Sequence, residues 1–251
     1  MSKKLAEGAG TLVLDVKWGK GAFMKTLAEA RKLARTMVEI GTRMKREMTA
    51  VITDMNQPLG KSVGNSVEII ETIQALKGSG PDDLMRETIE LSALMLTLSG
   101  RCKSRVQAVK MLNEKIVSGE ALEKFREMVR LHGGKTAFIE NHSLLPKAKY
   151  SKDLFSHKSG YVSEVDANLV GRACLVLGAG RSKTTDTIDH ASGITDIVKI
   201  GDRIGKGTRL LTLFSNDRKK LNEACKLASC AVKTSNHSPS VPRLIVETIL
   251  P

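Results

Sequence analysis

One loop in this sequence combines residue types that could do chemistry. Residues 54–60 read DMNQPLG, and residues 63–65 follow as VGN. The carboxylate of Asp54 could act as a general base in such a loop. An aspartate at the end of a strand more often caps the next turn, however, by accepting hydrogen bonds from nearby groups. We therefore predict a site at this loop without assigning proton transfer to Asp54.

The segments before the loop place it at one edge of a sheet. Residues 49–53 form an apolar run that ends at Asp54, and residues 11–17, TLVLDVK, form a β-branched run typical of a strand buried on both faces. Open α/β sheets bind ligands at the carboxyl ends of their strands. The position of the loop therefore also predicts a ligand site.

Other candidate motifs are weaker. Gly19 and Gly21 form a lone G-x-G, which backbone freedom explains better than a phosphate cradle does. Residues 177–181, LGAGR, resemble a phosphate loop by composition, but we expect turn geometry there. No histidine has a partner at catalytic spacing, so none is assigned a role. The histidines are His132, His142, His157, His190 and His237.

Hydrophobic periodicity predicts a helix-rich first part. Apolar residues recur at helical spacing in several segments, and glycines stand at or near most of their ends. Helices are predicted at residues 24–40, 67–76, 81–98, 106–116 and 120–131, and residues 1–10 read as the end of another. We expect Gly41 to stop the first of the long helices. With the two predicted strands, these helices indicate an α/β domain over residues 11–145.

The composition changes near Leu145 and Pro146 toward short β-prone runs and turns. A smaller α+β domain is therefore predicted over residues 146–251. It should contain a helix over residues 217–232 and should be completed by a strand over residues 243–249. The predicted fold class is α/β, a sheet flanked by helices, followed by this second domain.

Composition excludes several classes of protein. Lysine and arginine outnumber aspartate and glutamate by 40 to 27, but aromatic residues are only 3%, so stacking platforms for single-stranded nucleic acid are scarce. The four cysteines have no paired CxxC spacing, which argues against zinc and redox sites. No secretory peptide or membrane-spanning run is visible. A cytoplasmic protein with free thiols is expected.

Several motifs together resemble a known enzyme family. The motifs are SKKLAEG at residues 2–8, LVLDVK at 12–17, GAFMK at 21–25, the 54–60 loop with VGN, GEAL at 119–122, GYV at 160–162, LGAGR at 177–181, IDH at 188–190 and KIGD at 199–202. In the same order, they are similar to the thymidine phosphorylase and pyrimidine-nucleoside phosphorylase family. The resemblance implies a central domain like that of nucleoside phosphorylases and phosphoribosyltransferases, followed by a hammerhead-like domain.

Parts of the family pattern do not appear in the sequence. Family members carry a long amino-terminal segment with a Lys-His-Ser-Thr-Gly-Gly phosphate loop and with the arginine and serine that hold the pyrimidine. Met1 matches an internal methionine of a Ser-Ile-Met-Ser-Lys-Lys helix, so residues 1–10 are expected to be the remnant of a helical domain. The resemblance therefore implies a carboxyl-terminal portion of the enzyme, inactive alone.

The resemblance assigns substrate contacts to two residues. In phosphorolysis the base leaves with negative charge on its ring, and a positioned lysine stabilises that charge. Lys3 matches the pyrimidine-binding lysine of the family, although a terminal helix can equally carry an exposed lysine. Phe23 matches a position against the pyrimidine ring, where stacking is plausible, with a core aromatic as the alternative.

The resemblance also implies half of a potassium site. When the family pattern is matched to this sequence without gaps, two main-chain carbonyl ligands fall at Leu59 and Ser62 and one carboxylate ligand falls at Glu71. Hard monovalent cations favour such oxygen ligands, and carbonyl ligands require no particular side chain. The alternative for Glu71 is an ordinary glutamate on a helix surface. The remaining ligands belong to the amino-terminal segment, so K⁺ is expected to bind this chain alone weakly or not at all.

The implied reaction is phosphate-dependent cleavage of thymidine or another pyrimidine nucleoside by a pentosyltransferase. Inorganic phosphate is the co-substrate, and no organic cofactor is expected. Family members are homodimers, whereas the state of this chain is left open, as is the choice between thymidine and uridine. The rival interpretation is a non-catalytic interaction module or complementing subunit that pairs with a separate amino-terminal fragment. No nucleic acid or membrane partner is expected.

Overall fold

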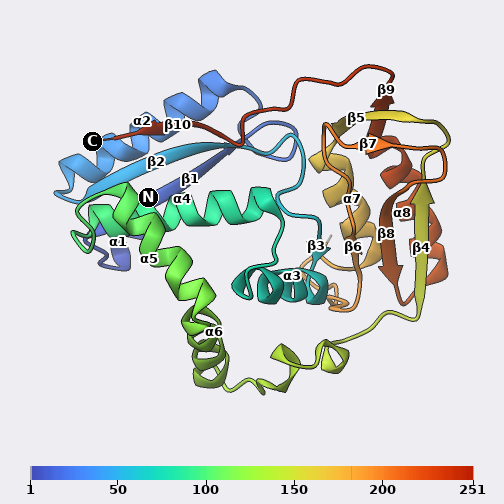
Figure 1. Ribbon diagram of the computed structural model, residues 1–251, viewed down its shortest axis with the longest axis horizontal. Helices are drawn as coiled ribbons and strands as arrows, with labels where there is room; N and C mark the ends of the chain where they lie inside the picture. The colour runs from blue at the N-terminus through green and yellow to red at the C-terminus, as the bar shows by residue number, and fades with distance from the viewer. Residues whose placement is uncertain (1, 182, 251) are drawn as a thin grey trace.

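The computed structural model describes residues 2–181 and 183–250, and its elements form two packed parts (Figure 1). The first part holds α1 Ser2–Ala6, β1 Thr11–Trp18, α2 Leu27–Arg43, β2 Glu47–Asp54, α3 Ser66–Leu76, α4 Asp82–Leu98, α5 Arg105–Val117 and α6 Glu120–Leu131. The second part holds β4 Tyr150–Phe155, β5 Gly160–Val165, α7 Ala167–Leu177, β6 Gly193–Thr195, β7 Arg203–Ile204, β8 Arg209–Ser215, α8 Arg218–Ala231 and β9 Val232–Ser235. Two further strands, β3 Val63–Gly64 and β10 Ile245–Ile249, cross between the parts.

The sheet of the first part has the strand order β1-β2-β10. β1 runs parallel to β2, and β10 runs antiparallel to it. The central strand β2 is buried from Met48 to Asp54. β1 has a strand neighbour on one side only within the described residues, and most of it is half-buried. The expected burial of β1 is therefore only partial, although helices α2 and α4 both pack against the strand.

Helix α2 covers one face of this sheet (Figure 1). It begins with a capping box, in which Thr26 and Glu29 each accept a backbone N–H of the other. The apolar face of α2 packs on β1 and β2 through Ala30, Ala34, Val38, Val16, Ala50 and Ile52. Contrary to the prediction, α2 continues through Gly41 to Arg43. The glycine is used for close packing, since a Cβ there would lie 2.8 Å from the Cβ of Met48.

The opposite face of the sheet carries a polar cluster beneath α4. The Lys17 ammonium lies 2.8 Å from a carboxylate oxygen of Asp15 and also bonds Glu87 of α4. The Thr53 hydroxyl donates to the other oxygen of Asp15. Only 3% of Glu87 is exposed. Burial of a carboxyl group disfavours its charged form.

The second part is built from two sheets and a pair of helices. One sheet has the order β3-β6-β8-β4, the other β7-β5-β9. Helices α7 and α8 pack against each other and against these strands. The core contains Val162, Val170, Leu177, Ile194, Leu211, Leu213, Leu221 and Ala228. The mixture of strands and helices agrees with the predicted α+β class.

Two features of the second part were not expected. Helix α7 lies in a stretch predicted as short strands and turns; its start is capped by Asp166, which accepts the N–H groups of Asn168 and Leu169. The final strand, predicted to complete the second domain, pairs instead with β2 of the first part. β10 thus belongs to the first sheet and β3 to a sheet of the second part, while the boundary near residue 146 stays a prediction.

The helices from α3 to α6 confirm the sequence prediction to within one or two residues. Helix α6 extends away from the rest of the first part and has no buried residue (Figure 1). No helix among the described residues has the length and apolar character needed to cross a membrane.

Candidate functional site

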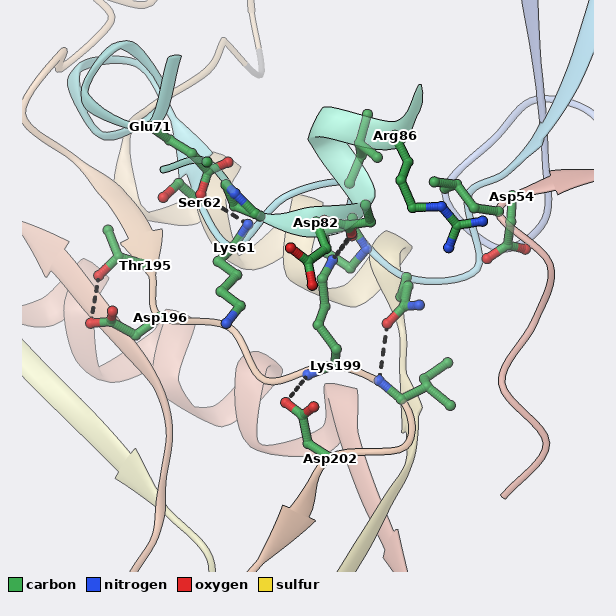
Figure 2. A pocket seen from close by; sticks show the side chains of 18 of the residues that line it. Asp54, Lys61, Ser62, Glu71, Asp82, Arg86, Thr195, Asp196, Lys199 and Asp202 are labelled. Atoms are coloured by element: carbon green, nitrogen blue, oxygen red, sulfur yellow. Dashed lines mark hydrogen bonds and ion pairs between the residues drawn. The ribbon is translucent and has the colours of Figure 1, made fainter. Parts of the chain in front are cut away.

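A cavity of about 1170 Å³ lies between the two parts, at the carboxyl end of β2 (Figure 2). The 54–60 loop and α3 form one side of it, and the amino-terminal end of α4 forms another. Residues 195–202 of the second part and residues 241–245 before β10 enclose the remainder. The loop that the sequence singled out therefore lines a cavity, as its position predicted.

Asp54 holds the beginning of the loop. It is 4% exposed, and its Oδ1 accepts a 2.5 Å hydrogen bond from the side-chain amide of Asn56. Burial raises the pKa of Asp54, while the hydrogen bonds from Asn56 and the charges of Lys17 and Lys199 act against that rise. These contacts confirm the expected capping role of Asp54.

Gly21 allows three segments to approach closely. Its N–H donates to the Met55 carbonyl at 2.9 Å. A Cβ at Gly21 would lie 2.8 Å from the Cβ of Ala167 and 3.0 Å from the oxygen of Met55. Close backbone packing at the entrance of α7 therefore explains this glycine.

Glu71 projects from α3 to the underside of the loop rather than to solvent. It is 7% exposed, and its Oε1 accepts the Lys61 N–H at 2.9 Å. A Cβ at Gly60 would lie only 2.1 Å from its Oε2. Burial raises the pKa of Glu71, and hydrogen bonds from the Lys61 backbone and the Ser62 side chain oppose the rise. The alternative of an ordinary surface glutamate is wrong.

A lysine of the second part reaches the same loop. The Lys199 ammonium lies 2.6 Å from Oδ2 of Asp83 and donates to the Pro58 carbonyl. The Asp83 oxygen also accepts the Gly60 N–H at 3.3 Å. The KIGD motif at residues 199–202 does not reveal this role, because an ion pair between residues so far apart in sequence has no local signal.

Three other cationic side chains line the cavity: Lys61, Arg86 and Arg243. Their side chains make no ion pair with the described residues, whereas Lys199 does. In Figure 2 the Arg86 side chain extends toward Asp54. Cationic groups that lack a protein partner can bind an anion by charge-assisted hydrogen bonds. The cavity thus combines anionic groups near the loop with uncommitted positive charge.

Both parts of the chain match known protein families. Residues 1–122 match the family model for the glycosyl transferase family, a/b domain, and residues 161–235 match that for the pyrimidine nucleoside phosphorylase C-terminal domain. Pyrimidine-nucleoside phosphorylases from Staphylococcus aureus strains MSSA476 and MW2 are 43% identical over 250 residues, all of this chain. The chain belongs to the pyrimidine-nucleoside phosphorylase family. It spans 57% of the length of these relatives.

The three potassium-site residues implied by the family resemblance meet in one place. Leu59, Ser62 and Glu71 all line the cavity. The set offers a buried carboxylate and main-chain carbonyls, which are the hard oxygen donors that K⁺ prefers. The described residues contain no cluster of three or more His, Cys, Asp or Glu side chains suited to a metal.

The two substrate residues implied by the resemblance lie elsewhere. Lys3 is exposed on α1, and Phe23, 97% exposed, follows β1. Neither side chain lines the cavity. The high exposure of Phe23 excludes the alternative of a core aromatic. Contact with a base stays a prediction for both residues.

Proposed function

We propose that this chain takes part in the phosphorolysis of pyrimidine nucleosides, cleaving thymidine to thymine and 2-deoxyribose 1-phosphate with inorganic phosphate. The observation that carries the proposal is the 43% identity to pyrimidine-nucleoside phosphorylases, which extends over both parts that enclose the cavity. The proposed setting is pyrimidine nucleoside salvage in the cytoplasm. Homodimers are proposed by analogy with the family.

The reaction requires groups that stabilise charge on both reactants, the nucleoside and the phosphate. Lys3 is proposed to stabilise the negative charge that develops on the leaving base, and Phe23 to stack on its ring. Bound K⁺ would supply a fixed positive charge between the loop carbonyls and α3. Leu59 and Ser62 would hold it with their carbonyl oxygens and Glu71 with its carboxylate, whose Lys61 hydrogen bond orients it.

Turnover by the isolated chain is not expected. The relatives contain further residues beyond the 57% that matches, and holding both reactants together accounts for a large part of such catalysis. We propose that the complementary portion of a phosphorylase, supplied as a separate fragment, restores phosphate-dependent cleavage. A non-catalytic module would bind such a fragment without restoring it.

The test mixes the purified chain with the portion of the S. aureus relative that the chain does not cover. Release of thymine from thymidine and of uracil from uridine is followed with and without phosphate. The proposal predicts phosphate-dependent release in the mixture, abolished by Lys3→Ala and retained by Lys4→Ala, the neighbouring exposed lysine. A stable complex without release from either nucleoside would favour the interaction module instead.

A further inference from the structure

Residues 197–200 of the second part run alongside the 54–60 loop and its continuation. The Ile197 N–H donates to the Lys61 carbonyl at 3.1 Å, and the Ile200 N–H donates to Oε1 of Gln57 at 3.1 Å. Between these two contacts, the Lys199 side chain donates to the carbonyl of Pro58. The segment therefore contacts the loop repeatedly across the domain boundary.

Lys199 is the charged centre of these contacts. Its side chain is 15% exposed, and its partner Asp83 is 22% exposed. Oδ2 of Asp83 receives both the Lys199 ammonium and the Gly60 N–H. The Lys199 backbone is itself held, because its N–H donates to Asp202 at 2.8 Å. One carboxylate oxygen thus joins the loop, the beginning of α4 and the second part of the chain.

The surroundings of Lys199 carry several negative groups. The carboxylates of Asp54 and Glu71 are close enough to feel its charge, and Asp83 repels Glu71. Without the ammonium, Asp83 would keep a partly buried charge with no cation beside it, and the Pro58 carbonyl would lose a donor. A movement of the loop toward solvent would relieve both costs. With the ammonium in place the loop is packed inward, since Pro58 and Gly60 are buried.

We propose that Lys199 is a positioning residue, through which the second part of the chain sets the conformation of residues 57–61. The ammonium holds the Pro58 carbonyl on one side and Asp83 on the other, and Asp83 in turn holds the Gly60 N–H. The Lys61 N–H is then placed on Glu71. This role concerns the shape of the loop, so it does not depend on whether the chain cleaves nucleosides.

The test is hydrogen exchange of the full chain, followed by mass spectrometry for peptides that cover residues 55–62. Lys199→Met removes the charge and keeps the length of the side chain, whereas Lys199→Arg keeps the charge. Lys61→Met is the matched control, because Lys61 lines the same cavity and its side chain makes no ion pair with the described residues. Asp83→Asn removes the partner and provides a second route if Lys199→Met folds poorly.

We expect Lys199→Met and Asp83→Asn each to speed exchange of residues 55–62 by about tenfold or more, a local opening that leaves β8 and α8 unchanged. Lys199→Arg should largely restore the slow exchange, and Lys61→Met should not alter it. The double variant should exchange no faster than Lys199→Met alone, since the ion pair is already lost in that variant. Exchange in Lys199→Met no faster than in Lys61→Met, or an equal rise throughout both parts, would overturn the proposal.

Discussion

Glu87 should make the stability of the protein depend on pH. Burial raises the pKa of Glu87 from its ordinary value of 4.5 to about 7, although the Lys17 ammonium opposes the rise; the neighbouring Asp15 adds to it. One Glu87 oxygen bonds Lys17, and the other, Oε2, is buried without a partner among the described residues. The folded protein therefore retains a proton that the unfolded chain releases above its ordinary pKa.

The sign and size of the effect follow from this difference. Between about pH 4.5 and pH 7 the folded state binds more protons than the unfolded state, so the free energy of unfolding falls as pH rises. A carboxyl pKa raised from 4.5 to about 7 corresponds to roughly 3 kcal/mol, fully lost above about pH 7. Glu87→Gln removes the titration and keeps the shape. As pH rises from about 4.5 to 8, the free energy of unfolding of Glu87→Gln should therefore increase relative to that of the wild type by up to about 3 kcal/mol.

Urea unfolding followed by circular dichroism at several pH values in this range provides the measurement. Glu114→Gln, on the exposed surface of α5, is the control and should shift the whole curve evenly. If the wild-type and Glu87→Gln curves run parallel across the range, Glu87 has the same pKa in the folded and unfolded states, and the expected pH dependence is refuted.

Two further predictions concern the packing and the caps. Gly60→Ala should lower the free energy of unfolding by about 2 kcal/mol or more, because the left-handed φ of +71° is unfavourable for alanine and the new Cβ would meet Glu71. Gly100→Ala has the same φ with open space around it, so in thermal unfolding it should cost only about 1 kcal/mol; equal losses would exclude a role for the Glu71 contact. Thr26→Ala should cost about 1 kcal/mol in chemical denaturation, and no loss would mean that the capping box adds nothing to α2.

The proposed potassium site was predictable only as a set of positions. Leu59, Ser62 and Glu71 could be named from the family resemblance, and the structure shows that they line one cavity. The Lys199–Asp83 ion pair could not be predicted, because its partners lie on different parts of the chain and neither has a periodic pattern. The exposure of Phe23 likewise depends on what packs over it, which no local pattern reveals.

The sequence by itself determined the local elements of the first part. Helices α3 to α6 follow directly from apolar spacing and from the glycines and proline at their ends, which act within one turn of the chain. Helix α7 was missed although its buried residues recur at helical spacing, because Gly171 in the middle of ANLVGRACLVL weakens the helix signal. The buried residues are Ala167, Val170, Ala173, Cys174 and Leu177.

Only the tertiary structure decided which strands pair and what surrounds the loop. The backbone groups of β10 pair with those of β2, nearly two hundred residues earlier in the chain, and β3 joins a sheet of the second part. These pairings depend on which edges the packed helices leave open, a property of the whole fold. The cavity forms where the two parts meet, so its charges and volume exist only once both parts have folded together.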